Sequence, residues 1–362
     1  MTKTTNRNAT RVLRHALAAS VALVLLASPA YAKPKIMILA TGGTIAGAQA
    51  STTEAGYKSG TFSVDDLIKA VPHLGDLADI SGEQIANIGS QTMNHEVWLK
   101  LASRINEVLK GATDGVVITH GTDTMEETGY FLSLVVKSDK PIVLVGSMRP
   151  ATATSADGPA NLYNAVALAA NPEARKGRGP MIVINDEIHY AREATKTNAT
   201  SLDTFKSPNR GRAGVMNTGK AYLFSPLATR HTASSEFSVE GKEAKDLPRV
   251  DIVYSYANFG RDTIDYLVGA GTKGIVLAGV GDGNSTDDAI AALAEAAKKG
   301  IAVVRSSRVG SGIVVRNVEV DDDKNGFIAA MELNPQKARI LLMLGLMKTS
   351  DPKALQQYFM EY

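Results

Sequence analysis

The chain has 362 residues, with 39 lysines and arginines against 37 aspartates and glutamates, and it has no cysteine. This near balance of charge excludes a strongly basic surface of the kind that binds nucleic acid or anionic membranes. The lack of cysteine excludes disulfide bonds, thiol nucleophiles and thiolate metal sites. The six histidines are scattered and form no metal-binding motif, so we expect neither a metal ion nor a cofactor.

The first 32 residues have the three parts of a secretory signal peptide. Basic residues without any acid come first, an apolar run over residues 16–27 follows, and an A-x-A site ends the segment at Ala32. We expect cleavage after Ala32 and export of residues 33–362 to the periplasm. A retained N-terminal anchor is the alternative, although the apolar run is short for a membrane span.

A predicted strand that runs into a glycine-rich loop is the central feature of the sequence. Residues 36–40 are an apolar run typical of a buried parallel strand, and T-G-G-T-I-A-G follows at residues 41–47. Ligands in open α/β sheets bind beyond the carboxyl ends of the strands, where this loop would lie. Three interpretations remain open: a dinucleotide site, a tight turn without chemistry, and a hydroxyl nucleophile at Thr44. The glycine spacing differs from G-x-G-x-x-G, which disfavours the dinucleotide site.

A second loop of the same kind follows another buried strand. Residues 116–119 are apolar and continue into H-G-T-D-T at residues 120–124, before a predicted helix. Thr122 and Asp123 should therefore lie at the same edge of the sheet as Thr44. The alternative is that the aspartate or the threonine after it only caps the helix.

Three polar segments could supply partners for these hydroxyls. Residues 48–60 are predicted to form a long mobile loop whose only aromatic residue, Tyr57, is either a surface anchor or part of a lid. Residues 85–89 are predicted to be a short strand before a polar loop. Lys196 lies in a polar, irregular stretch; such a lysine is usually solvated, but one held near a threonine and an aspartate can act as a base.

The strand and helix patterns predict two domains, residues 33–240 and 241–362. The pattern weakens over residues 211–249, and residues 230–248 are predicted to be a linker. In the second part, we expect strands at 250–256, 274–280 and 301–305, a helix that starts at Ser285, a helix opened by Asn334 and Pro335, and a last helix after residue 350.

The two threonine loops resemble the signature loops of the bacterial type II L-asparaginases and glutaminase-asparaginases. Further motifs occur in that family's order: N-I-G-S-Q, S-M-R-P, S-A-D-G-P-x-N-L-Y-N, T-K-T-N, R-S-S-R and L-N-P-Q-K-A-R. The resemblance covers residues 35–362. It implies an α/β fold, in which a larger N-terminal domain has a mainly parallel sheet flanked by helices and a smaller C-terminal α/β domain follows. It also implies a homotetramer with active sites completed by a neighbouring subunit.

The resemblance implies an exported amidohydrolase that converts L-asparagine to L-aspartate and ammonia, with weaker action on L-glutamine. Thr44 would be the nucleophile, and Tyr57 would help to take its proton. Lys196 would hold or remove the proton of Thr122, while Asp123 orients the lysine and binds the substrate's ammonium group. The implied substrate-binding set lies on the loops and, for its last two members, on a neighbouring subunit: Gly43, Gly89, Ser90, Gln91, Gly121, Thr122, Asp123, Asn284 and Glu319.

A periplasmic amino-acid-binding protein is the alternative from another functional class. It would also be exported, cysteine-free and built from two α/β domains, but it would not need paired hydroxyls with a lysine and an aspartate. Two positions depart from relatives within the family. Asn284 stands where glutamine-active relatives often carry serine, which favours asparagine as substrate, and Ser138 stands where some members have the second cysteine of a pair.

Overall fold

The computed structural model describes residues 32–51, 56–175 and 177–362. The chain divides into two units, residues 1–33 and 34–362, and every helix and strand described below belongs to the second. The expected signal peptide lies outside the described residues except for its last residue, Ala32. Within the described part, no helix combines the length and the apolar composition that a membrane span requires.

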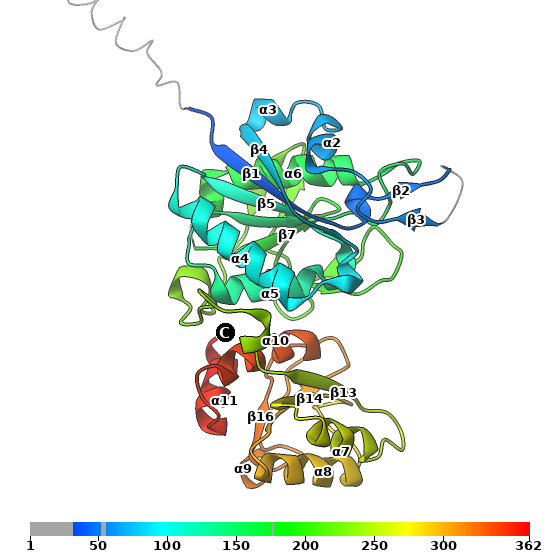
Figure 1. Ribbon diagram of the computed structural model, residues 1–362, viewed down its shortest axis with the longest axis vertical. Helices are drawn as coiled ribbons and strands as arrows, with labels where there is room; N and C mark the ends of the chain where they lie inside the picture. Colours follow the sequence, from blue (N-terminus) through cyan, green and yellow to red (C-terminus); the bar gives the residue numbers. More distant parts are fainter. Residues whose placement is uncertain (1–31, 52–55, 176) are drawn as a thin grey trace, which may run out of the picture. The chain divides into compact units, whose positions relative to one another are not determined.

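An eight-stranded sheet forms the centre of the N-terminal part (Figure 1). Its order is β12-β11-β8-β7-β6-β5-β1-β4. The strands are β1 (Lys35–Gly42), β4 (Asp79–Ile88), β5 (Gly115–Thr119), β6 (Ile142–Val145), β7 (Pro180–Ile184), β8 (Glu187–Tyr190), β11 (Gly214–Asn217) and β12 (Lys220–Leu223). The strands from β7 to β4 are parallel, and the other three pair antiparallel. The predicted, mainly parallel sheet is confirmed.

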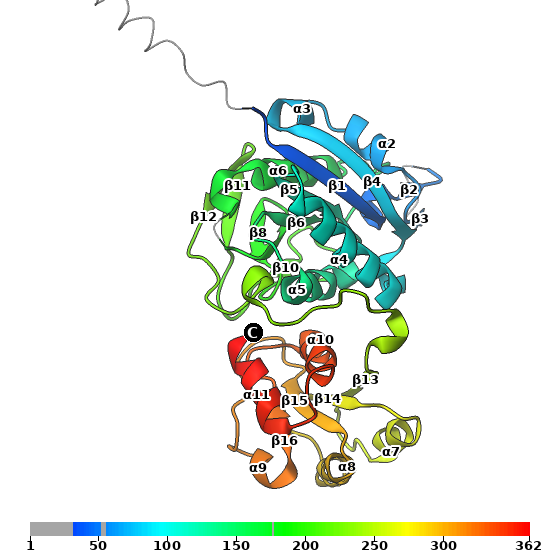
Figure 2. The same cartoon turned by 60° about the vertical axis from the view of Figure 1, so that its left-hand side comes forward.

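Helices cover both faces of this sheet (Figure 2). On one face, α4 (His95–Lys110) and α5 (Met125–Val135) share a buried cluster with Leu39, Ile118 and Leu144. On the other face, α2 (Val64–Lys69), α3 (Leu74–Leu77) and α6 (Gly158–Ala170) share a cluster that includes Val117 and Val143. Successive strand residues point to opposite faces, so strands that are apolar at every position need helices on both sides.

The C-terminal part is a smaller parallel sheet with helices on both faces. It has the order β13 (Val250–Tyr254), β14 (Gly274–Gly279), β15 (Ala302–Ser307) and β16 (Phe327–Ala329). One buried cluster includes residues of α7 (Asp262–Gly269) and α8 (Asp287–Lys298). The other face packs against α10 (Pro335–Leu346) and α11 (Pro352–Glu361), and α10 also contacts α5. One apolar cluster therefore runs from the first sheet to the second. The boundary near residue 240 stays a prediction.

Polar residues cap several helices through hydrogen bonds, and the predicted start of a helix at Asn334 is confirmed. Ser63 and Asp66 form a capping box at the start of α2, Asn94 accepts from the Val97 N–H at 3.0 Å, and Asn334 caps α10. One predicted cap is wrong.

The helix predicted to start at Ser285 has Thr286 as its cap instead. The Ser285 hydroxyl lies 2.9 Å from Ser255 Oγ, so it is already paired with another element. The sequence offers two neighbouring hydroxyls for one cap, and the tertiary contact decides between them.

The predicted short strand at residues 85–89 is wrong in length, because β4 begins at Asp79. It is an edge strand of the sheet, and most of its residues are exposed or half-buried, so it contains no continuous apolar run. An edge strand with one side in water lacks the continuous apolar pattern that marks an inner strand.

The stretch after β7, predicted to be polar and irregular, begins with a buried strand, β8. Its polar side chains have partners: His189 Nδ1 lies 2.9 Å from Ser207 Oγ, and Tyr190 donates to the Ser225 carbonyl at 2.8 Å. Paired polar groups can be buried in a strand that does not look apolar.

The weak pattern over residues 211–249 also hides structure. It contains the hairpin of β11 and β12. The predicted linker, residues 230–248, has two short 3-10 helices and buries Phe237, Val239 and Leu247. The Phe237 ring lies 4.9 Å from that of Tyr358. The segment is thus packed against the core at these buried residues.

Candidate active site

Three loops meet at the carboxyl ends of β4, β1 and β5. The strand β1 lies between β4 and β5, so the chain passes to one side of β1 and then to the other. Such a reversal in strand order is where ligands bind in open α/β sheets. The loops that follow the three strands carry Gly89 to Gln91, Gly43 with Thr44, and Gly121 to Asp123.

Glycines let these loops touch. A Cβ atom on Gly43 would lie 2.3 Å from the Gly121 backbone nitrogen, and one on Gly121 would lie 2.6 Å from Ser90 Oγ. Gly43 also has a φ of 83°, in the left-handed region that favours glycine. A side chain at either position would push the loops apart. The threonines that follow the two glycines, Thr44 and Thr122, are therefore held close together.

Thr44 is buried and is paired with a tyrosine. It begins a short 3-10 helix (Thr44–Ala46), and its Oγ1 lies 2.8 Å from Tyr57 Oη, with either atom able to donate. Tyr57 belongs to β3 (Tyr57–Lys58), which pairs antiparallel with β2 (Ala48–Gln49). These two hydroxyls lie within the distance needed for direct proton transfer.

A lysine joins the second threonine to an aspartate. Lys196 Nζ donates to Thr122 Oγ1 at 2.9 Å and to Asp123 Oδ1 at 2.6 Å. The lysine lies on β9 (Thr195–Lys196), which pairs with β10 (Phe205–Lys206). Its side chain is 16% exposed, whereas that of Asp123 is 57% exposed. The carboxylate is thus open to solvent, whereas the lysine is largely covered.

Ser90 ties the third loop to the second. Its Oγ accepts a hydrogen bond from the Asp123 N–H at 3.1 Å, and its carbonyl accepts one from Thr124 Oγ1 at 2.8 Å. Because Ser90 Oγ accepts the first bond, its hydroxyl hydrogen can be donated to a ligand. Gln91 is exposed beside it, and Gly89 leaves room for that side chain, since a Cβ atom there would lie 2.5 Å from Gln91 Oε1.

Asn284 and Glu319 lie apart from this cluster. Asn284 Nδ2 donates to a Glu319 carboxylate oxygen, and the two side chains line a hollow of the C-terminal domain. A buried ion pair fixes the surrounding segments, because Arg305 Nε binds Asp322 Oδ1 at 2.6 Å and Arg305 Nη1 donates to the Asp282 carbonyl at 2.8 Å. No recorded contact within the described residues joins Asn284 or Glu319 to the threonine loops.

A buried hydrogen-bond chain that the sequence did not reveal supports the second loop. The Gly121 carbonyl can only accept, so His120 Nδ1, at 2.7 Å, carries the hydrogen. His120 Nε2 then accepts from Thr128, whose hydroxyl in turn accepts from Trp98 Nε1, each at 2.8 Å. Burial lowers the pKa of His120 to about 4, so the ring is neutral near neutral pH. The only signal in the sequence is the position of the histidine beside Gly121.

Matches to two family models span most of the chain. Residues 35–228 match the model described as "Asparaginase, N-terminal", and residues 249–359 match "Glutaminase/Asparaginase C-terminal domain".

Individual relatives match over nearly their whole length. A "Probable L-asparaginase periplasmic" from Haemophilus influenzae is 53% identical over 329 residues, which are 91% of this chain and 93% of that protein. A "Glutaminase-asparaginase" from Pseudomonas fluorescens is 48% identical over 90% of each chain. The crystal structure of a "Probable Cytoplasmic L-asparaginase" from Campylobacter jejuni superposes with a TM-score of 0.88 at 53% identity, and the match covers 91% of this chain and all of that one.

Proposed function

This chain belongs to the asparaginase family, and from that premise we propose that it hydrolyses the side-chain amide of L-asparagine to L-aspartate and ammonia, with weaker action on L-glutamine. One observation carries the proposal: Lys196 binds both Thr122 and Asp123 next to a loop where a second threonine, Thr44, is paired with Tyr57. A binding protein needs no such pair of activated hydroxyls.

In the first half of the reaction, Thr44 Oγ1 attacks the amide carbon of the substrate. A threonine hydroxyl is a weak nucleophile, so Tyr57 assists by taking its proton through the 2.8 Å contact. Backbone N–H groups of the glycine-rich loops stabilise the negative charge on the tetrahedral intermediate. Tyr57 then passes this proton to the amide nitrogen, the C–N bond breaks, ammonia leaves, and an ester of Thr44 remains.

In the second half, water attacks this ester, which releases L-aspartate and restores the Thr44 hydroxyl. Lys196 donates to Thr122 Oγ1, so the hydroxyl hydrogen of Thr122 stays available for exchange with the reacting groups. Asp123 orients the lysine through the 2.6 Å ion pair and offers its exposed carboxylate to the substrate's ammonium group. Ser90 and Gln91 hold the other end of the amino acid. Fixing both charged ends lowers the entropic part of the barrier.

Ammonia release by residues 33–362, measured with L-asparagine and L-glutamine side by side, tests the reaction and the preference together. We expect faster turnover of L-asparagine. Equal or faster turnover of L-glutamine would overturn the preference that Asn284 suggests. A folded protein that binds either amino acid and returns it unchanged would instead be a binding protein.

Replacing Tyr57 with phenylalanine is expected to lower kcat by about 10²-fold, because the ring stays and only the proton acceptor is lost. The measurement is steady-state ammonia release at saturating asparagine. Tyr222→Phe is the matched control, since Tyr222 is 46% exposed and Tyr57 is 45% exposed. Turnover of Tyr57→Phe close to that of the control would remove the tyrosine from the mechanism.

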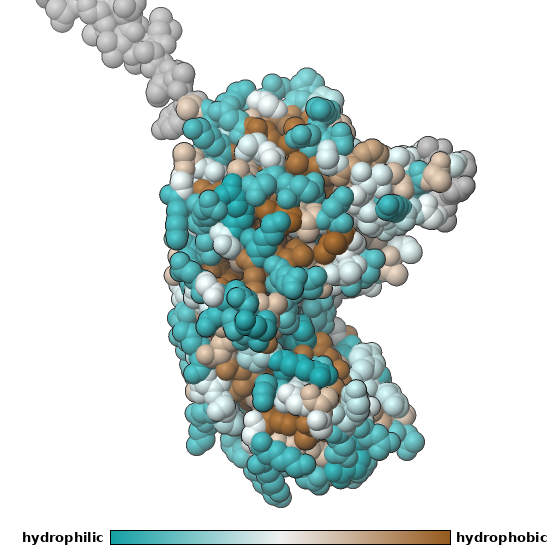
Figure 3. Space-filling model, in the orientation of Figure 1, coloured by the Kyte–Doolittle hydropathy of each residue, from teal (hydrophilic) through white to brown (hydrophobic). Residues whose placement is uncertain are grey.

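The proposed assembly is a homotetramer in which a neighbouring subunit's Asn284 and Glu319 complete each site. Exposed apolar side chains support association. The face of the molecule in Figure 3 is mainly hydrophilic, and apolar residues are visible among the hydrophilic ones. On the C-terminal domain, Ile252, Tyr254 and Tyr256 are 38%, 58% and 54% exposed along and just beyond the edge strand β13. Apolar residues on an unpaired strand edge favour contact with another chain.

Mixing two inactive variants tests the shared site. In a mixed oligomer of Thr44→Val and Glu319→Ala subunits, a site shared between chains combines an intact threonine with a neighbour's intact glutamate. We therefore expect partial recovery of ammonia release after the two variants are unfolded and refolded together. Sites built within one subunit would give no recovery, and the mass of the assembly in sedimentation tests the number of subunits.

The proposed location is the periplasm. The signal-peptide pattern supports it, as does the relative named as periplasmic, whereas the relative of known structure is named as cytoplasmic. The mass of the protein from a periplasmic extract tests this point, because the exported chain should begin at Lys33. An intact N-terminus would overturn cleavage after Ala32.

A further inference from the structure

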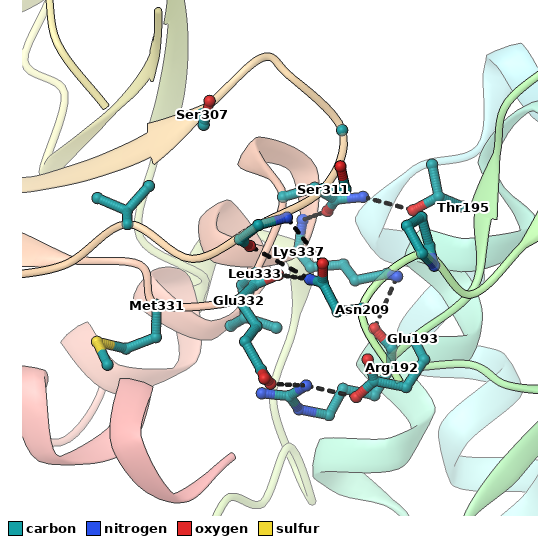
Figure 4. A pocket seen from close by; sticks show the side chains of 15 residues that line it. Arg192, Glu193, Thr195, Asn209, Ser307, Ser311, Met331, Glu332, Leu333 and Lys337 are labelled. Atoms are coloured by element: carbon teal, nitrogen blue, oxygen red, sulfur yellow. Dashed lines mark hydrogen bonds and ion pairs between the residues drawn. The ribbon is translucent and has the colours of Figure 1, made fainter. Parts of the chain in front are cut away.

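The first turn of α10 enters a pocket beside the segment that carries Lys196. The walls of this pocket include Arg192, Glu193 and Thr195 of the N-terminal domain, and residues 331–334 and Lys337 of the C-terminal domain. Figure 4 shows Lys337 reaching from its helix toward the segment with Arg192 and Thr195. The threonines of the active site do not line the pocket, so it has a different role from the ligand site.

Lys337 is a buried cation in the first turn of α10. Its side chain is 2% exposed. Nζ donates to the Arg192 carbonyl at 2.8 Å and to the Ala194 carbonyl, and it lies 3.4 Å from Glu126 Oε2. A buried ammonium group is costly unless it has such partners. The lysine therefore holds two main-chain carbonyls, those of residues 192 and 194, on the approach to Lys196.

Asn334 uses both ends of its amide group. Its Oδ1 accepts from the Lys337 N–H at 3.1 Å and so caps α10. The two hydrogens of Nδ2 are donated to Thr195 Oγ1 and to Glu126 Oε2, each at 3.1 Å. An amide NH₂ group has two donors, and both are used here. One side chain thus joins the residue before Lys196 to a carboxylate on α5.

Glu126 links this cluster to the loop that carries Thr122, the hydrogen-bond partner of Lys196. It lies in the first turn of α5, directly after the loop with Thr122 and Asp123. Its second oxygen accepts from Gln336 Nε2 at 3.0 Å, so both of its oxygens are bound by α10 or its cap. The same cluster therefore holds the segment before Lys196 and the helix that follows Thr122.

We propose that Lys337, Asn334 and Glu126 are positioning residues that set the distance between Lys196 Nζ and Thr122 Oγ1. The expected effect on kcat rests on the proposed function, whereas the expected effect on the distance between Lys196 and Thr122 does not. The alternative is that the cluster only joins the two domains. A joining role alone would leave Lys196 in place when the two Nδ2 hydrogen bonds of Asn334 are lost, and this difference can be measured.

The test variant is Asn334→Ser. Serine is also a good helix cap, so α10 keeps its start, but the two Nδ2 hydrogen bonds are lost. In a crystal structure of the variant, we expect the separation of Lys196 Nζ and Thr122 Oγ1 to exceed hydrogen-bond distance. We expect kcat for L-asparagine to fall by about 10- to 100-fold, because displacements near 1 Å can cost that much, with KM changed by less than about threefold.

Two comparisons separate positioning from loss of stability. Asp351→Ala removes a helix cap at the start of α11 and should lower the melting temperature while leaving kcat unchanged. In a Lys196→Met background, Asn334→Ser should reduce kcat no further, since the cluster acts through that lysine. A further loss there of the same size as in the wild type would overturn the proposal.

The outcomes also distinguish this proposal from the proposed function. An inactive wild-type protein would remove the proposed reaction, and the crystal structure of the variant would still decide the geometry. An unchanged distance between Lys196 and Thr122 in Asn334→Ser would overturn the proposal whatever the activity. If the wild type is active and Asn334→Ser leaves kcat unchanged, the catalytic part of the proposal is overturned.

Discussion

Thr44→Val is expected to lower turnover of L-asparagine by roughly 10⁴-fold or more, since no acyl-enzyme can form without the hydroxyl. Valine has nearly the same shape as threonine, so the buried site should keep its packing. The lost hydrogen bond to Tyr57 lies at an exposed tyrosine, where water can replace the missing partner. The measurement is ammonia release, with thermal unfolding as a check that the variant is folded.

Thr41→Val is the matched control for this variant. Thr41 lies in the same glycine-rich loop sequence, and its hydroxyl donates to the Thr119 carbonyl at 2.9 Å. Its loss should cost about 1 kcal/mol of stability and should leave the chemistry in place. If Thr44→Val retained turnover within about tenfold of this control, Thr44 would not be the nucleophile, and Thr122 would be the hydroxyl to test next.

Lys196→Met is expected to lower kcat by about 10²- to 10⁴-fold, because the cation that donates to Thr122 Oγ1 and assists its proton exchange is removed. Methionine keeps the length of the side chain without its charge. The exposed Asp123 carboxylate loses its ion pair but stays in water, so the fold should tolerate the change. The measurement is kcat at saturating L-asparagine, with KM as a separate readout.

Lys206→Met is the control, because Lys206 lies on the paired strand β10 and contacts Asp203 and Glu187 instead of the threonine loops. Thr122→Val should cause a loss similar to that of Lys196→Met, and the double variant should be little worse than either one. Residues that act as a unit give non-additive losses. If the fold loss of kcat in the double variant equals the product of the two single losses, the lysine and the threonine act separately.

Much of the fold could be predicted because its signals are local. The inner strands β1, β5 and β6 are continuous apolar runs, and the caps of α2, α4 and α10 are encoded by single polar residues. The failures share a physical cause. The start of β4, the strand β8 and the hairpin of β11 and β12 lie at or toward the two edges of the sheet, where partners or water satisfy polar side chains and the apolar pattern fades.

The sequence by itself determined the two glycine–threonine loops, since a buried strand followed by glycine places hydroxyls at the sheet edge regardless of the rest of the chain. Only the tertiary structure decided which partners reach them. Lys196 meets Thr122 across 74 positions, and Asn334 meets Glu126 across 208. Such pairings depend on how β9 and α10 pack against α5. That packing comes from many weak apolar contacts spread over the core, and no local motif records it.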